Sequence, residues 1–379
     1  MIHAAYLHIP FCHHICHYCD FNKVFFENQP VEQYLEAVNK EMETTMENFP
    51  TNYFKTIFVG GGTPTALTEE QLEVFLQGVK KYLPFDEETE YTFEANPNEL
   101  TVEKLQLMKK YGVNRLSIGV QTFNEELLKK IGRVHTNSQV EQVIAQAKEH
   151  GFHNISIDLM YNLPGQTMED FKQSIEKAVS LNVPHISSYS LIVEPKTVFY
   201  NLHRKGKLHL LPQEKEAEMY EYLMDTLASE GYEQYEISNF AKKGFESKHN
   251  LTYWENNEYF GIGAGAHGYM NEVRRANAGP LKKYIHAVEE KGHAYIEEHK
   301  VTEAEKMEEE MFLGLRKGEG VNKAIFETKF SRSMDSIFHE QIEDLKKRGL
   351  LEEDKQSVFL TRQGKLLGNE VFSQFIGVI

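Results

Sequence analysis

Residues 5–19 read AYLHIPFCHHICHYC, from Ala5 through Cys19, and they decide the fold. An apolar stretch typical of a buried strand, Ala5–Ile9, leads into Cys12, Cys16 and Cys19, which are the only cysteines of the chain. Three thiolates in the spacing Cys-x3-Cys-x2-Cys can hold three irons of a cubane cluster. The fourth iron then lacks a protein ligand and is free to chelate a small molecule. The stretch therefore predicts a 4Fe–4S cluster with one open iron.

Two other uses of these thiols stay open at this point. A structural zinc ion needs four ligands, and His13, His14 or His17 could supply the fourth. A redox-active pair is a weaker alternative, because Cys-x2-Cys occurs once and without a thioredoxin-like context. A secreted disulfide framework is not indicated, since it would use an even number of cysteines spread along the sequence.

Short apolar strands recur along the first half of the chain and alternate with amphipathic helices. The expected strands are Ala5–Ile9, Thr56–Val59, Tyr91–Phe93, Arg115–Ile118, Ile155–Leu159 and His185–Tyr189. The expected helices are Val31–Met46, Glu69–Tyr82, Thr101–Tyr111, Ser138–Glu149 and Met168–Leu181. Such alternation predicts an α/β fold with a parallel sheet. Six units are too few to close a TIM barrel, so we expect a partial, open (β/α)6 barrel with its chemistry at the C-terminal ends of the strands.

The pattern changes after about Pro195. A charged helix over Pro212–Ser229 precedes a segment rich in Gly, Asn and aromatic residues, Tyr232–Tyr269. Farther on we expect helices at Thr302–Leu315 and Met334–Arg348, a strand at Val358–Thr361 and a last helix from Gln363. This predicts a small C-terminal domain that is mainly helical and winged-helix-like. The expected domains are a barrel over 1–235, a connecting segment over 236–298 and the accessory domain over 299–379.

Composition narrows the class of protein. The formal net charge is −16, and so acidic a surface repels phosphate backbones, so we expect no nucleic-acid partner. The first residues lack a basic region followed by an apolar run, and no apolar stretch approaches the ~20 residues of a membrane span. The expectation is a soluble cytoplasmic protein.

Glycines and polar residues follow the expected strands. Gly60-Gly61-Gly62-Thr63-Pro64 follows the second strand, where glycines would let the backbone approach a ligand; a tight loop is the alternative. Glu94, Gln121 and Asp158 lie at the ends of the next three strands, and Arg133 follows Gln121. Each alone could be a capping or solvated side chain. Together they offer carboxylates for hydroxyl and amino groups and a guanidinium for a carboxylate.

The cysteine spacing after the first strand, followed by these segments in this order, resembles the radical S-adenosylmethionine superfamily. The similarity is strongest to the branch of oxygen-independent coproporphyrinogen dehydrogenases (HemN) and heme chaperones (HemW), and it includes residues 158–166 and 189–195. The resemblance implies that the open iron takes S-adenosylmethionine, with Tyr6 and Tyr18 lining its site. The implied direct ligands are Gly61, Gly62, Thr63, Glu94, Gln121, Arg133 and Asp158, and the looser matches are Ile192 and His267.

Two features divide that branch. The dehydrogenases carry a further cysteine at the position of Phe21, and they have an N-terminal extension ahead of the motif. Conversely, His249-Asn250-Leu-Thr-Tyr253-Trp254 matches the His-Asn-x-x-Tyr-Trp signature of the heme chaperones. An imidazole is a common axial ligand of heme iron, and aromatic rings offer flat apolar surfaces for a porphyrin. A histidine turn beside two core aromatics is the alternative.

The resemblance therefore implies a heme chaperone that binds heme through His249 and passes it to an acceptor protein. A radical enzyme that decarboxylates the propionates of coproporphyrinogen III is the second reading, and a zinc-stabilised binding module is the third. A reducing electron donor would be a further partner. The resemblance also allows peripheral association with membrane respiratory proteins.

Overall fold

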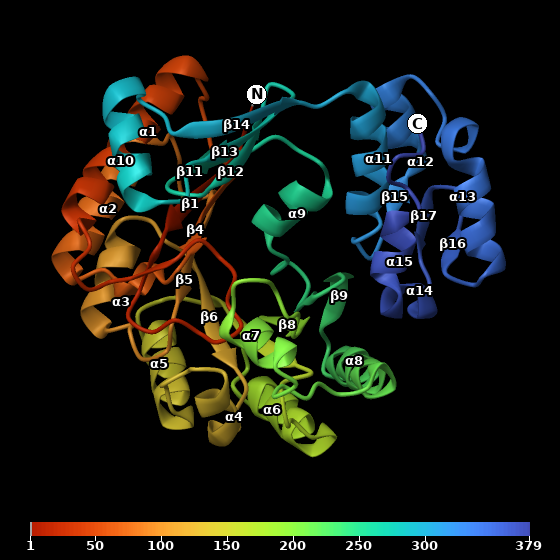
Figure 1. Ribbon diagram of the computed structural model, residues 1–379, viewed down its shortest axis with the longest axis horizontal. Coiled ribbons are helices and arrows are strands. Elements are labelled where there is room, and N and C mark those ends of the chain that lie inside the picture. Colours follow the sequence, from red (N-terminus) through yellow and green to blue (C-terminus); the bar gives the residue numbers. More distant parts are fainter. Residues whose placement is uncertain (1) are drawn as a thin grey trace.

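The computed structural model describes residues 2–379 and contains the predicted alternation of strands and helices (Figure 1). All six expected strands are present, and they run parallel in one sheet. Their bounds are β1 Ala4–Ile9, β4 Thr56–Gly61, β5 Glu90–Ala95, β6 Arg115–Gln121, β7 Asn154–Tyr161 and β8 His185–Ser190. The five expected helices are also present, and their bounds in the structure are α1 Val31–Asn48, α2 Glu69–Tyr82, α3 Val102–Lys110, α5 Asn137–Glu149 and α6 Met168–Ser180. The α/β prediction is confirmed.

The main sheet is larger than expected and has nine strands in the order β11-β1-β4-β5-β6-β7-β8-β10-β9. The added strand β11 (Phe260–Ile262) runs parallel to β1, although it lies far along the chain. At the other edge, β10 (Asn239–Ala241) and β9 (Glu233–Glu236) pair antiparallel. Strands of three or four residues show no readable alternation, so the sequence does not reveal them. Residues 236–298 thus contribute strands to the barrel sheet as well as connecting its ends.

The same region also builds a second, antiparallel sheet, β12-β13-β14, and two helices. The bounds are β12 His267–Met270, β13 Val273–Asn277, β14 Tyr295–Lys300, α9 Lys248–Trp254 and α10 Leu281–Lys291. The short helices α4 (Glu125–Lys130) and α7 (Val198–Arg204) are also additions to the expected pattern, whereas the charged helix is present as α8 (Gln213–Ser229). In Figure 1, α1, α2, α3 and α10 cover one side of the sheet and α9 lies on the other.

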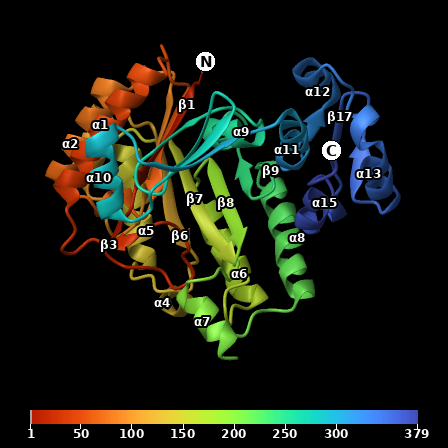
Figure 2. The same cartoon turned by 45° about the horizontal axis from the view of Figure 1, so that its top comes forward.

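The C-terminal residues form a separate small unit, as predicted. Its helices are α11 Glu303–Gly314, α12 Lys323–Phe330, α13 Asp335–Lys347, α14 Arg362–Leu366 and α15 Gly368–Ser373. Its strands are β15 Val321–Asn322, β16 Leu351–Glu353 and β17 Ser357–Leu360, and they form a short antiparallel sheet in the order β15-β17-β16. The unit has a hydrophobic core of its own, which includes Met311, Phe326 and Phe338. Figures 1 and 2 both place it beyond α8 and α9, away from the helices α1–α5.

Capping boxes begin one helix in each unit. Thr68 and Gln71 form the capping box of α2, and Thr302 and Glu305 form that of α11. None of the helices in residues 2–379 combines the length and the apolar character that crossing a membrane requires.

A buried glutamate ties the late strand β11 to the first helix. The Glu41 side chain on α1 is fully buried, and its carboxylate accepts hydrogen bonds from Gly263 N (2.8 Å), Asn277 Nδ2 (2.7 Å) and the Tyr284 hydroxyl (2.6 Å). Gly263 follows β11, Asn277 ends β13 and Tyr284 lies on α10. Burial raises the pKa of Glu41 to about 7. One side chain therefore fixes the whole 260–290 region against the start of the barrel.

We expect Glu41 to make folding stability depend on pH. The pKa is higher in the folded chain than in an unfolded one, so the folded state holds the proton more tightly. The resulting stabilisation is full below about pH 4.5 and is lost as the pH rises through about 7, by roughly 3 kcal/mol. Urea unfolding of the wild type and of Glu41→Gln should show this: the variant cannot ionise, so its free energy of unfolding should change less over that interval. Equal slopes would contradict the assignment.

Candidate functional site

The three cysteines face one cavity of about 490 Å³ at the end of β1. Cys12 is buried, Cys16 and Cys19 are partly exposed, and all three thiols are free. The Thr63 hydroxyl donates a hydrogen bond to Cys12 Sγ (3.5 Å), which joins the cysteine loop to the glycine loop. Burial raises the pKa of the Cys12 thiol to about 12, so an apo thiolate is costly, and a bound iron would offset that cost.

The histidines of the loop are placed differently from the cysteines. His13 Nε2 is hydrogen-bonded to the Ala66 carbonyl (3.2 Å) and His17 Nδ1 to the Lys130 carbonyl (2.8 Å), whereas His14 lines the cavity. Within residues 2–379, no three His, Cys, Asp or Glu side chains lie close enough to hold one metal ion. Thiolates of a 4Fe–4S cluster bind three different irons, so they need not approach one another that closely.

The polar residues at the strand ends line the same cavity. Glu94 ends β5, Gln121 ends β6, Asp158 lies on β7, and Arg133 reaches in from the loop after α4. Because the carboxyl ends of parallel strands meet at one edge, residues far apart in sequence converge there. Gln121 sits at a β-bulge with φ of 68°, a conformation that redirects its side chain.

Hydrogen bonds hold these side chains in place. Gly61 N donates to Glu94 Oε2 (3.1 Å), and the Ser117 hydroxyl donates to Asp158 Oδ1 (3.1 Å). Arg133 donates to the Tyr18 hydroxyl (3.2 Å) and to Asn96 Oδ1, while its Nε is buried without a partner. Burial, with Asp158 nearby, raises the pKa of Glu94 to about 8, and burial also raises the pKa of Asp158. The cavity therefore combines two neighbouring, half-buried carboxyl groups with a fixed guanidinium.

The glycine loop, residues 60–62, packs closely against the end of β1 and the residues that follow it. A Cβ on Gly61, where φ is +116°, would lie 2.4 Å from the His8 ring, and a Cβ on Gly62 would lie 2.6 Å from the Pro10 carbonyl carbon. The sequence suggests that these glycines let a ligand approach. Both glycines line the cavity, so the approach of a ligand to them stays a prediction. In the structure they also let the loop pack against the end of β1, and that packing brings Thr63 to Cys12.

The remaining residues expected at the site lie in different places. Tyr18 and Ile192 line the cavity, and Ile192 is largely exposed at its mouth. Tyr6 stacks on Phe58 beneath the cavity, with its hydroxyl 3.0 Å from His8 Nδ1, and does not line it. His267 begins β12 in the second sheet, so the structure does not bring it to the cavity.

Sequence reasoning misses several lining residues. Asn96, Arg115, Tyr189 and Asn250 also face the cavity. Period-two alternation back from Gln121 would place Arg115 on the inward face of its strand. Asn250 belongs to the His-Asn-x-x-Tyr-Trp segment, but the sequence does not place it at this cavity, because its position depends on where α9 packs.

The helix α9 carries the His-Asn-x-x-Tyr-Trp segment and lies on the concave side of the sheet (Figure 2). His249 is 1% exposed, and both ring nitrogens have partners: Nδ1 lies 2.9 Å from the Thr56 hydroxyl and Nε2 lies 2.8 Å from the Tyr253 hydroxyl. The ring stacks on Phe58 with the centroids 5.1 Å apart. Burial lowers the pKa of His249 to about 3, so the imidazole is neutral. A free ligand position on this ring requires one of those hydrogen bonds to break.

The end of α9 contacts the C-terminal unit. Arg316, which follows α11, lies over the Trp254 ring at 5.0 Å, and the indole Nε1 of Trp254 is buried without a partner. Tyr253 and Trp254 line a cavity of about 360 Å³ together with Tyr259 and Phe312. One short helix therefore joins the barrel, the cavity with the cysteines and the C-terminal unit.

A carboxylate anchors the start of α9. Glu90, the first residue of β5, accepts hydrogen bonds from Lys248 N (3.0 Å), His249 N (3.0 Å) and the Ser247 hydroxyl (3.5 Å). Such charge-assisted bonds satisfy backbone donors that the helix leaves free. Glu90 thereby fixes where His249 and Tyr253 lie.

We expect Glu90→Gln to lower the free energy of unfolding by about 1–3 kcal/mol. In the variant, the side-chain NH2 group of glutamine replaces one carboxylate oxygen, so one backbone N–H of α9 loses its acceptor. Urea unfolding measures the loss. Glu246→Gln is the matched control, since that half-exposed carboxylate accepts only from Gly244 N. Equal losses in the two variants would show that Glu90 does not anchor the helix.

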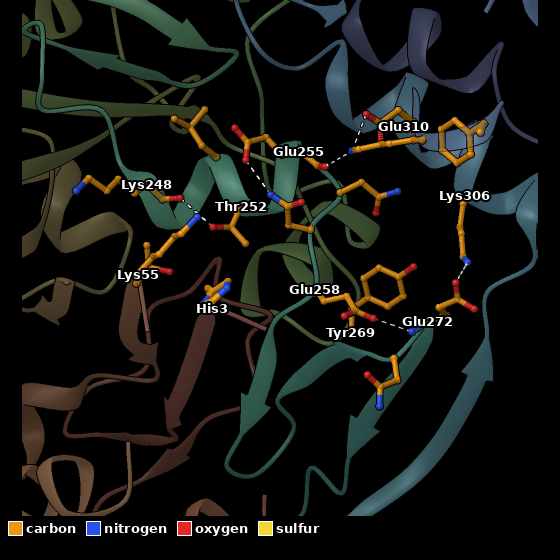
Figure 3. Close-up of a pocket in the computed structure, with 18 residues that line it drawn as sticks. His3, Lys55, Lys248, Thr252, Glu255, Glu258, Tyr269, Glu272, Lys306 and Glu310 are labelled. Carbon is orange, nitrogen blue, oxygen red and sulfur yellow. Dashed lines mark hydrogen bonds and ion pairs between the residues drawn. The ribbon is translucent and has the colours of Figure 1, made fainter. Parts of the chain in front are cut away.

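A larger cavity of about 1020 Å³ lies against another face of α9 (Figure 3). It is lined mainly by charged and polar residues, among them Lys55, Lys248, Glu255, Lys306 and Glu310. Lys306 pairs with Glu272, and Lys329 pairs with Glu310. None of the residues that the sequence marked for the site lines it, whereas most of them line the smaller cavity.

Comparison with known proteins agrees with this geometry. Residues 6–178 match the Radical SAM superfamily, and residues 301–367 match the HemN C-terminal domain. The solved structure of coproporphyrinogen III oxidase (HemN) from Escherichia coli superposes with a TM-score of 0.87, covering 100% of this chain and 91% of that one, at 24% identity. That likeness shows a shared fold.

Two curated relatives are similar over nearly their whole length. The heme chaperone HemW of Bacillus subtilis is 56% identical, with 99% of both chains covered. The heme chaperone HemW of Lactococcus lactis is 48% identical, over 98% of this chain and 97% of that one. The chain belongs to the HemW family of the radical SAM superfamily.

Proposed function

We propose that this protein is a heme chaperone, which binds heme and passes it to an acceptor protein. We further propose that it carries a 4Fe–4S cluster whose open iron takes S-adenosylmethionine. The observation that carries the proposal is the 56% identity with the heme chaperone HemW of Bacillus subtilis over 99% of both chains.

The cavity fits the cluster and its adenosyl ligand. Three free thiols line it, and the buried Nε of Arg133 lacks a partner there. Cys12, Cys16 and Cys19 would hold the cluster, Glu94 and Asp158 would accept hydrogen bonds from amino and hydroxyl groups, and Arg133 would bind a carboxylate. When bound and reduced, the cluster can supply one electron to the sulfonium of S-adenosylmethionine.

Heme binding by His249 requires a rearrangement of α9. Both ring nitrogens are engaged and the ring is buried against Phe58, so heme iron can bind only after Nε2 leaves the Tyr253 hydroxyl or Nδ1 leaves the Thr56 hydroxyl. Movement of α9 away from the sheet would expose His249 together with the rings of Tyr253 and Trp254. Because Asn250 of the same helix lines the cysteine cavity, occupancy of that cavity can influence this movement.

Hemin titration of the purified chain tests the proposal. A Soret band that saturates at about one heme per chain is the expected result, since one imidazole site is available. Absorbance that rises without saturation would indicate nonspecific uptake and would contradict a dedicated heme site.

The three cysteines, Glu94, Gln121, Arg133 and Asp158 all line the cavity and favour a second candidate, a radical enzyme. Such an enzyme would decarboxylate the propionate side chains of coproporphyrinogen III. Phe21 lines the cavity, where the resemblance places a further cysteine in the dehydrogenases. We expect no vinyl product from coproporphyrinogen III under reducing, anaerobic conditions, and turnover would favour the enzyme over the chaperone.

A further inference from the structure

A buried arginine faces the cofactor cavity without belonging to the expected cofactor ligands. Arg115 is the first residue of β6, its side chain is 2% exposed, and it lines the cavity together with Ser117, Gly119 and Gln121 of the same strand. Burying a guanidinium is costly unless another charge or a ligand compensates for it.

The protein supplies no close partner for this guanidinium. Its Nε is buried without a hydrogen bond, and no carboxylate in residues 2–379 forms an ion pair with it. The charge is therefore held inside the cavity, where it acts through space on the groups around it.

Arg115 is surrounded by titratable side chains from five other elements. They are Glu94 on β5, Asp158 on β7, His185 on β8, Tyr235 on β9 and His249 on α9, and the positive charge of Arg115 lowers the pKa of each. Burial keeps both histidines neutral. The carboxyl groups of Glu94 and Asp158 are thus the acidic groups on which this charge acts.

We propose that Arg115 is a positioning residue that favours the ionised form of Glu94 and Asp158, so that the cavity floor binds the cationic part of S-adenosylmethionine. The inference rests on the proposed cofactor site. Two neighbouring, half-buried carboxyl groups oppose each other's ionisation, and a nearby cation offsets this. Arg115 and Arg133 are the two guanidinium groups that favour ionisation of this carboxyl pair.

The register of the sheet supports this role. Glu94 pairs with Ser117 and Gly119 pairs with Asp158, so the two carboxyl groups flank β6, the strand that begins at Arg115. Other groups also act on them. Those that face Glu94 are Tyr6, Gly61 N, Arg115, Arg133, Asp158 and Tyr253, and those that face Asp158 are Glu94, Arg115, Ser117, Arg133, Ser156, Ser187 and Tyr189. Arg115 is the cation on the strand between the two carboxyl groups.

The test is the affinity for S-adenosylmethionine of the full, anaerobically reconstituted chain as a function of pH. In the wild type we expect the affinity to rise until Glu94 ionises near pH 8. Arg115→Met should bind about tenfold more weakly at neutral pH, with the rise displaced upward by about one pH unit. Arg115→Lys keeps the charge and should follow the wild-type profile. A folded Arg115→Met variant with an unshifted profile would overturn the inference.

A second measurement needs no cofactor. If Arg115 is the counterion, Arg115→Met destabilises the chain by leaving the two carboxyl groups uncompensated, and adding Glu94→Gln should recover part of the loss in thermal midpoint. A double variant no more stable than Arg115→Met would overturn the inference even where the single variant folds poorly. Failure of the wild type to bind S-adenosylmethionine would instead contradict the cofactor site, and the stability comparison would still decide the role of Arg115.

Discussion

Cys12→Ala is expected to remove the iron–sulfur cluster from the reconstituted chain. Iron content should fall from about four atoms per chain to below about one, and the broad visible absorption shoulder should disappear. Cys12 is the most buried of the three thiols and is fixed by the Thr63 hydroxyl at the end of the first barrel strand. With two ligands left, the cubane has no stable attachment at this loop.

The matched control for this variant is His14→Ala. His14 lies in the same loop and lines the same cavity, but the cluster assignment gives it no ligand role. Its removal should leave the iron content unchanged. Stoichiometric zinc without iron in the wild type, lost in both variants, would contradict the cluster and support a zinc site with a histidine ligand.

His249→Ala is expected to weaken heme binding at least about tenfold, because the neutral imidazole is the axial ligand in the proposed complex. Tyr253→Phe should act in the opposite direction. It removes the hydroxyl that occupies Nε2, and the loss of one such hydrogen bond, about 1 kcal/mol, should tighten heme binding about fivefold. The measurement for both is hemin titration followed at the Soret band.

Two further variants separate ligation from folding. His249→Gln keeps a polar partner for the Thr56 hydroxyl and so preserves more of the packing of α9, yet it lacks the imidazole. His286→Ala removes an exposed histidine from α10 and should bind heme as the wild type does. Heme affinity that is unchanged in both His249 variants would remove His249 as the heme ligand.

The sequence predicts the barrel because its signals are local. Each of the six strands is a short apolar run followed by a helix, and a parallel arrangement brings their ends together, so the sequence alone places Glu94, Gln121 and Asp158 near the cysteines. The late strand β11 cannot be found in this way. Its three residues pair with β1, and the buried Glu41 that holds the region in place gains its partners only in three dimensions.

Contacts that form only in three dimensions also explain why the sequence does not reveal all the neighbours of the site residues. Gly61 and Gly62 suggest close approach to a ligand, but the neighbours that require glycine are His8 and Pro10. The signature histidine can be recognised, whereas its engagement by Thr56 depends on where α9 packs. The contact with Tyr253 follows from the i,i+4 spacing on one helix, but the contact with Thr56 joins residues 193 positions apart, and no spacing in the sequence encodes it.

The central claim is that one chain holds a cluster at the cysteine loop and a heme at α9. It is tested most directly by counting non-heme iron and heme in the same sample after anaerobic reconstitution and hemin titration. We predict about four non-heme irons and about one heme per chain, with heme uptake retained in Cys12→Ala. A sample that takes up the cluster but never a saturating heme, or that loses heme together with the cluster, would contradict the claim.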